Sequence, residues 1–118
     1  EPESTIFSFV DGFFRLLYLK NAAYGGELKA MYTYGLTLKN GDGIPINKHE
    51  AAMLLKIAAC KGELNATHSY GLMLKKGDGI LINKEGAAEY VKKAARNGNA
   101  KSAYMYAIML KNEDRIPE

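Results

Sequence analysis

Cysteine, histidine and long apolar runs are scarce in this chain of 118 residues. The one cysteine, Cys60, has no partner for an intramolecular disulfide, which favours a reducing compartment, and we predict a cytoplasmic protein. The sequence contains no stretch of about 18 uninterrupted apolar residues, so we expect no direct membrane insertion. The chain begins with Glu1 and not with methionine, and we interpret it as a fragment or a processed product.

Residue combinations that carry chemistry are also missing. His49 and His68 are the only histidines, and with a single cysteine they make no metal-ligand pattern. No serine precedes a lysine by three positions, which removes the simplest acylating-serine motif. The two Gly-Asp-Gly segments lack the lysine and hydroxyl residue that end a phosphate-binding loop. We therefore predict that the chain is not an enzyme and binds neither a metal nor a cofactor.

The charge of the chain is nearly balanced. Sixteen Lys and Arg residues against thirteen Asp and Glu residues give a formal net charge of +3 and an isoelectric point of about 8.9. This small surplus is a weak indication of acidic partners, and it is far from the basic surface of a nucleic-acid-binding protein. We expect a single domain over residues 1–118 and no nucleic-acid partner.

The sequence repeats itself with a period of 36 residues. Tyr34, Gly35 and Leu36 return at 70–72 and, with Ala and Ile for Gly and Leu, at 106–108. A period of this length is typical of solenoids, in which each unit buries its apolar face only against its neighbours. The predicted segments are an N-terminal helix with an incomplete repeat at 1–28, full repeats at 29–64 and 65–100, and a terminal capping helix at 101–118.

Each full unit is predicted to contain two helices. In the first helix, Ala30, Tyr34 and Leu38 recur at the helical spacing and form a core stripe. Gly35 lies beside that stripe, and because glycine costs a helix roughly 1 kcal/mol against alanine, we expect a close neighbouring helix there. In the second helix, the core stripe consists of the apolar residues Ala51, Leu55, Ala58 and Ala59.

The loop between the two helices has its own pattern. We expect Gly41 or Gly43, and Gly77 or Gly79 in the next unit, to adopt a positive φ. The isoleucines that follow, Ile44 and Ile46, are expected to fill the corner between the helices. Asn47 is a good N-cap residue, and Glu50 three positions later completes a capping-box-like pattern that the second unit lacks. The whole chain is predicted to be all-α with about six antiparallel helices, with room for a separate turn before the first.

These recurring positions resemble the Sel-one-like repeat (SLR) family, a relative of the tetratricopeptide repeat. The resemblance rests on the Tyr-Gly pair, the Gly-x-Gly-Ile loop, the polar cap and the alanine pairs with the following glycine, and it covers roughly residues 15–116. It implies a right-handed α/α solenoid superhelix and a role as a scaffold or adaptor that binds a protein or peptide. The cysteine pairs of secreted bacterial members are absent, so the resemblance does not imply a disulfide-bridged secreted role here.

The same resemblance implies a binding groove along the first helices, on the side away from the core stripe. Lys39, Lys75 and Lys111 occupy one repeat position, and Tyr32, His68 and Tyr104 occupy another. An acidic segment would suit this row of charges. The residues that we expect to bind it are Lys29, Tyr32, Lys39, His68, Lys75, Lys76, Tyr104 and Lys111. The competing interpretation is that the lysines are solvated surface residues copied by duplication.

Two other functions remain open. All four phenylalanines, at positions 7, 9, 13 and 14, lie near the N-terminus, where the helix either folds back as a cap or pairs with another chain as a homodimer. Helical repeats of similar length also bind RNA, one base for each unit, although the groove positions here are not arranged as base-reading pairs.

Overall fold

The computed structural model describes residues 2–112, with side chains from residue 11 onward, and within this range it consists of helices and loops without a strand. The six helices are α1 (Pro2–Tyr24), α2 (Leu28–Asn40), α3 (Lys48–Cys60), α4 (Leu64–Lys76), α5 (Lys84–Arg96) and α6 (Ala100–Lys111). The predicted all-α fold and its six helices are confirmed. No separate turn precedes the first helix between residues 2 and 24, because α1 is continuous over 23 residues.

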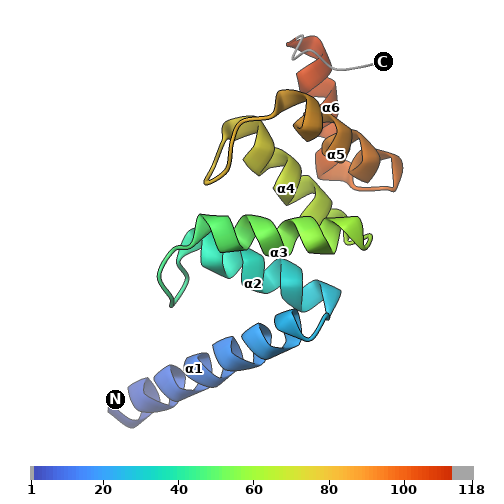
Figure 1. Cartoon of the computed structure of the whole chain (residues 1–118). Helices are drawn as coiled ribbons and strands as arrows, with labels where there is room; N and C mark the ends of the chain where they lie inside the picture. The colour runs from blue at the N-terminus through green and yellow to red at the C-terminus, as the bar shows by residue number, and fades with distance from the viewer. Residues whose placement is uncertain (1, 113–118) are drawn as a thin grey trace.

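The helices are stacked one after another along one direction, from α1 at one end to α6 at the other (Figure 1). The molecule measures 57 × 23 × 23 Å and has a radius of gyration of 16.2 Å. A globular domain of this length has a radius of gyration of about 13 Å. The elongated shape follows from the repeat, because the helices pack mainly against their neighbours in sequence and the buried residues form one continuous core along the stack.

The predicted core stripe of the first helices is buried. Ala30, Tyr34 and Leu38 are all below 8% exposed. The structure also explains the helical glycines: a Cβ on Gly35 would lie 3.0 Å from Leu55 Cγ, and one on Gly71 would lie 2.8 Å from a Val91 methyl group. The expected close approach of α2 to α3, and of α4 to α5, is therefore confirmed.

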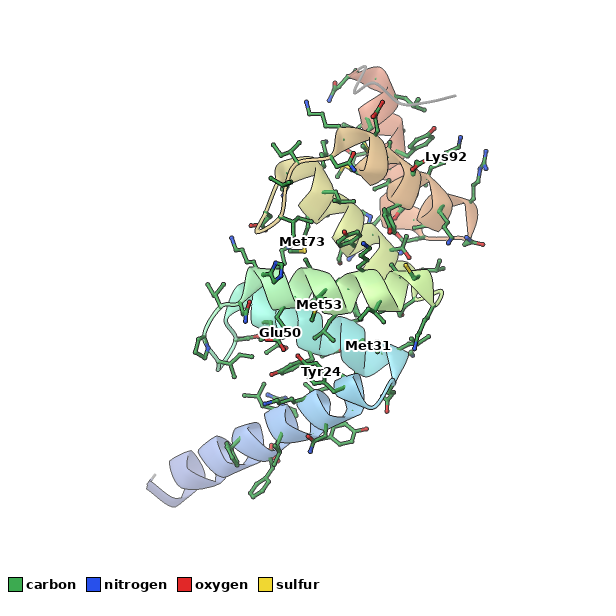
Figure 2. All side chains as sticks on the ribbon, in the orientation of Figure 1. Tyr24, Met31, Glu50, Met53, Met73 and Lys92 are labelled. Carbon is green, nitrogen blue, oxygen red and sulfur yellow. The ribbon has the colours of Figure 1, made fainter. Side chains whose placement is uncertain are left out.

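The second helices contribute alanines to the same core. Ala51, Ala58 and Ala59 are buried, as the stripe predicts, and Ala87 and Ala94 of the next unit are buried as well. The predicted core left out two methionines, Met31 on α2 and Met73 on α4, which are also buried (Figure 2). The repeat did not reveal them, because their counterparts in the other unit are Thr67 and Thr37.

The loop glycines adopt the conformation that the sequence predicts. Gly41, Gly43, Gly77 and Gly79 have φ values of 73°, 82°, 68° and 81°. The two isoleucines of the loop behave differently from each other. Ile44 packs against the core, whereas Ile46 is largely exposed and covers Gly41 instead. The expectation that both fill the corner was therefore wrong for Ile46.

Asparagine begins both second helices. Asn47 Oδ1 accepts a hydrogen bond of 3.0 Å from the Glu50 backbone N–H, which confirms the cap. The predicted capping box differs in its second bond. Glu50 Oε1 accepts from the Asn47 side-chain amide at 3.1 Å and not from the Asn47 backbone N–H. The Asn47 backbone N–H is already bound to the Leu38 carbonyl oxygen, which ties the cap to the end of α2.

Helix α1 is longer than the second helices of the full units, and its N-terminal half extends away from the rest of the stack (Figure 1). Phe13 and Phe14 are 56% and 58% exposed, and their rings contact each other edge to face. The helix does not fold back, so of the two alternatives the structure does not have the N-terminal cap. The side chains of Phe7 and Phe9 lie outside the described residues.

Candidate functional site

The predicted binding face lies on α2, α4 and α6, but its three aromatic positions are not equivalent. Tyr32 and His68 are half-buried, and Tyr32 packs against the hydrophobic core. Tyr104, at the same repeat position, is 70% exposed. The difference follows from the stack, because His68 on α4 is covered by α6, whereas no helix within residues 2–112 follows α6 to cover Tyr104. The three residues at this repeat position therefore do not form three like groups on one open face.

His68 takes part in the contact between α4 and α6. Its Nδ1 lies 2.7 Å from the hydroxyl oxygen of Ser102, which is fully buried. A second bond joins the same helices, because the Asn99 side-chain amide donates to Asn65 Oδ1 at 3.1 Å. Burial lowers the pKa of His68, and the nearby charge of Lys101 lowers it further. Both effects favour the neutral form of the ring over the charged form.

The lysines at the shared repeat position also differ in their surroundings. Lys39 and Lys75 are half-buried, while Lys111 is exposed. The Lys75 ammonium lies 3.9 Å from the sulfur of Met105 on α6, so this side chain lies along the neighbouring helix. Lys29 and Lys76, the other two predicted lysines, are exposed. The face therefore carries the expected charges, but not as a uniform row.

The structure adds a cluster of charges that the sequence did not indicate. Asp78, in the loop after α4, forms an ion pair of 2.6 Å with Lys48 at the start of α3. The hydrogen bond from Lys48 holds the pKa of this carboxyl below its usual value, and the charges of Lys48, Lys39 and Lys76 lower it further. We call Lys39, Lys48 and Lys76 the Asp78 lysine cluster. Three helices, α2, α3 and α4, contribute one lysine each.

The repeat pattern contains a signal for this cluster. Lys48 and Asp78 both belong to the recurring pattern, and they lie in consecutive units. The ion pair joins two different positions of the repeat, so a comparison of equivalent positions does not reveal it. A Cβ on Gly79 would collide with the Lys48 side chain, so the loop of one unit lies directly against the second helix of the unit before it.

Other candidate sites in the described part of the chain offer less. An open cleft of about 330 Å³ lies where α3 ends, α4 begins and α5 ends, and it is lined by Ala59, Gly62, Leu64, Thr67, Lys93 and Asn97. The Thr67 hydroxyl already donates to the Glu63 carbonyl oxygen. Among the described residues no three or more His, Cys, Asp and Glu side chains form a group that could hold a metal ion. No helix in this range is both long and apolar enough to cross a membrane.

The fold and the site together define a helical-repeat protein. The sequence model of the Sel1 repeat matches residues 28–63 and 64–99, which is more than half of the chain. The chain therefore belongs to the Sel1 repeat family, as the resemblance predicts. A search of curated proteins gave no match.

Solved structures of similar proteins agree with this assignment. A Sel1 repeat protein from Oxalobacter formigenes is 28% identical with a TM-score of 0.72, over 80% of this chain and 71% of that one. A protective antigen with an SLR fold, present in uropathogenic Escherichia coli strains, is 30% identical with a TM-score of 0.70, over 72% of this chain. The match covers only 18% of the antigen itself. Cysteine-rich protein B of Helicobacter pylori shares the fold at 20% identity, with a TM-score of 0.71 over 76% of this chain and 68% of that one.

Proposed function

We propose that this chain is an adaptor that binds an extended acidic segment of a partner protein along α2, α4 and α6. The Sel1 repeat fold is generally a protein–protein interaction scaffold and is typically not enzymatic. The proposal adds the site and the chemistry of the partner. The observation that carries it is the Asp78 lysine cluster, at the point where consecutive units meet.

The cluster has more positive charge than its own carboxylate can neutralise. One carboxylate, Asp78, faces the three ammonium groups of Lys39, Lys48 and Lys76, and its strongest bond is with Lys48. The charges of Lys39 and Lys76 also act on that carboxylate. Additional carboxylates from a partner would balance the surplus positive charge, and complementary charges increase the rate and the specificity of association.

The remaining predicted residues extend the surface toward α6. Tyr104 and Lys111 are both exposed there. An aromatic ring and an ammonium group on one helix offer an acidic peptide a stacking surface and a charge. His68 and Tyr32 have a structural part in this proposal, since both lie between helices. We propose no catalytic role, no nucleic-acid partner and a cytoplasmic location.

The test is a titration of the 118-residue chain with a dye-labelled oligoglutamate peptide, followed by fluorescence anisotropy. Reversing three charges, Lys39→Glu, Lys76→Glu and Lys111→Glu, is expected to weaken binding by at least about tenfold. Lys76 is used in place of Lys75, because the Lys75 side chain packs against Met105 and its reversal would also disturb the contact between helices.

The chain offers a matched control on the second helices. Lys20, Lys56 and Lys92 occupy one repeat position on α1, α3 and α5. Reversing these three changes the net charge by the same amount, and binding is expected to stay close to that of the parent. If both triple variants weaken binding equally, net charge alone attracts the peptide and the proposed site is wrong. A single-stranded RNA titrated at two salt concentrations tests the RNA alternative with the same variants.

A further inference from the structure

Within residues 2–112, the helices at the two ends of the stack leave complementary faces uncovered. In each full unit, a first helix packs against its own second helix, as α2 does with α3 and α4 with α5. By the 36-residue period, α6 is a first helix, and α1 from residue 12 onward is a second helix. Within residues 2–112, α6 has no second helix of its own and α1 has no first helix of its own.

The uncovered face of α6 corresponds to the face of α2 and α4 that packs against the second helix in each full unit. Ala107 stands where Gly35 and Gly71 lie, and it is exposed whereas both glycines are buried. Leu110 stands at the position of Leu38 and Leu74 and is 52% exposed, against 5% and 8% for those leucines. The face is therefore apolar for the same reason as its buried counterparts, and it lacks only the helix that covers them.

The uncovered face of α1 corresponds to the face of α3 and α5 that packs against the first helix in each full unit. Tyr18 stands at the position of Leu54 and Tyr90, and it is 61% exposed whereas Leu54 is buried and Tyr90 is half-buried. Leu19 stands at the position of Leu55 and Val91, the two side chains that lie against the helical glycines.

One aromatic pair links the two open faces. In the second full unit, Tyr70 on α4 and Tyr90 on α5 form an edge-to-face contact with ring centroids 4.9 Å apart. The position of Tyr70 is occupied on α6 by Tyr106, and the position of Tyr90 is occupied on α1 by Tyr18. Each end of the molecule thus carries one half of a contact that the molecule already makes in its interior.

We propose that α6 of one copy packs against α1 of a second copy and completes a unit like α4 with α5. Tyr106 then contacts Tyr18 of the second copy, and Ala107 lies against its Leu19. Two residues set this helix pair wider apart than the pairs within one chain, α2 with α3 and α4 with α5. Ala107 stands in place of a glycine, and Arg15 stands in place of the alanine at positions 51 and 87. The methylene stem of Arg15 can lie along the contact with its guanidinium group in water. We expect this wider contact to be weaker than those within the chain and the association to be reversible.

The symmetry of this contact separates it from the pairing of two N-terminal helices. Joining α6 to α1 uses two different faces, so each copy can bind one copy at each end and association does not stop at a dimer by symmetry. Pairing of α1 with α1 through Phe13 and Phe14 uses one face twice and stops at a dimer. The inference does not rest on the acidic-peptide site.

Sedimentation velocity of the 118-residue chain over a wide range of concentration tests the proposal. The 13.0 kDa chain is expected to show a weight-average mass that rises with concentration and passes that of a dimer. Tyr18→Glu and Ala107→Glu each block one end, and each variant alone is expected to remain a monomer. Both positions are exposed, so circular dichroism should show an unchanged fold.

Mixing the two blocked variants gives the sharpest outcome. Tyr18→Glu keeps an intact α6 face and Ala107→Glu keeps an intact α1 face, so the equimolar mixture is expected to form a species of two chains and nothing larger. Leu81→Glu, at a loop position that is 90% exposed, should associate like the parent. A chain that stays monomeric at every concentration overturns the proposal. So does a dimer that Ala107→Glu leaves intact, which would indicate pairing through α1 alone.

Discussion

The two full repeats, residues 28–63 and 64–99, have the same contacts where their helices cross but different junctions with the unit before. At the crossing, Gly35 lies against Leu55 in one repeat and Gly71 lies against Val91 in the other. A glycine therefore faces a branched apolar side chain in both. The larger residue differs between the two crossings and the glycine does not, and the side chains at a crossing set how closely the helix axes approach.

At the junctions the two repeats differ. The loop of the second repeat lies against Lys48 and forms the ion pair with Asp78. The loop of the first repeat lies against Leu16 on α1, and the position of Lys48 is there occupied by Gly12. Asp42, the counterpart of Asp78, is exposed. The comparison teaches that duplication preserves contacts inside a unit, whereas contacts between units depend on what the neighbouring unit provides.

The largest expected effect is on the contact that both repeats share. Ala58 and Ala94 are fully buried at the same repeat position. Ala58→Leu and Ala94→Leu should each lower the free energy of unfolding by about 1–3 kcal/mol, because the added side chain overfills a tight helix contact. Urea unfolding gives this value, with Lys56→Leu on the exposed side of α3 as the control. A midpoint equal to that of the parent would contradict the tight contact.

A smaller effect should separate the two junctions. Gly43 and Gly79 have φ values of 82° and 81°, so alanine at either position has the same backbone strain. A Cβ on Gly79 would also collide with Lys48 Cβ, which the helix backbone holds in place, whereas one on Gly43 would meet only the movable end of Leu16 at 3.2 Å. Gly79→Ala should therefore lose about 1 kcal/mol more than Gly43→Ala in thermal or urea unfolding. Equal losses would mean that the two junctions are equally tight.

The third prediction concerns pH and the contact between α4 and α6. Because burial lowers the pKa of His68 in the folded chain, the unfolded chain binds a proton more readily between that pKa and 6.5. Stability from this group is fully present above pH 6.5 and is lost as the pH falls toward the folded pKa. His68→Tyr, the residue found at positions 32 and 104, should remove this part of the pH dependence. Urea unfolding at pH 7.5 and 5.5 measures it, and His49→Tyr, at an exposed position, should leave it in place.

The smallest expected effect is at the ion pair. Lys48→Met removes the partner of Asp78 and should lower stability by about 0.2–1 kcal/mol, since both side chains are partly exposed and salt screens the pair. The pKa of Asp78 is lowered, so this contribution is present above its usual value of 3.8 and disappears as the pH falls below it. Lys84→Met, at the equivalent position of the next unit, is the matched control. Equal losses for both variants at low and high salt would show that the ion pair contributes nothing.

Much of the fold could be predicted because the repeat displays the same physical requirement twice. Gly35 and Gly71 indicated a close helix contact, and the loop glycines indicated positive φ values, since few other residues accept either role. Helix α1 was less predictable. Its apolar residues lie all around the helix, so the sequence alone did not show whether it folds back, and the structure has it extended.

The candidate site was predicted less well than the fold. Lys29, Lys76, Tyr104 and Lys111 lie on the exposed surface as expected. His68 does not, because the side chain that covers it, Ser102, lies 34 positions away on another helix. Lys48 was missed for the same reason, because its partner Asp78 belongs to the following unit. Equivalent positions in a repeat share a backbone, but their neighbours differ from one unit to the next.

The sequence by itself determined the period, the helices, the loop conformation and the small-residue contacts within each unit. These depend on local backbone preferences and on side-chain volume at fixed spacing, and both can be recognised from the residues. Only the tertiary structure decided which faces are covered, that the pKa of His68 is lowered and which lysines gather around Asp78. Those properties arise where consecutive units touch, and burial and charge there depend on residues that are distant along the chain.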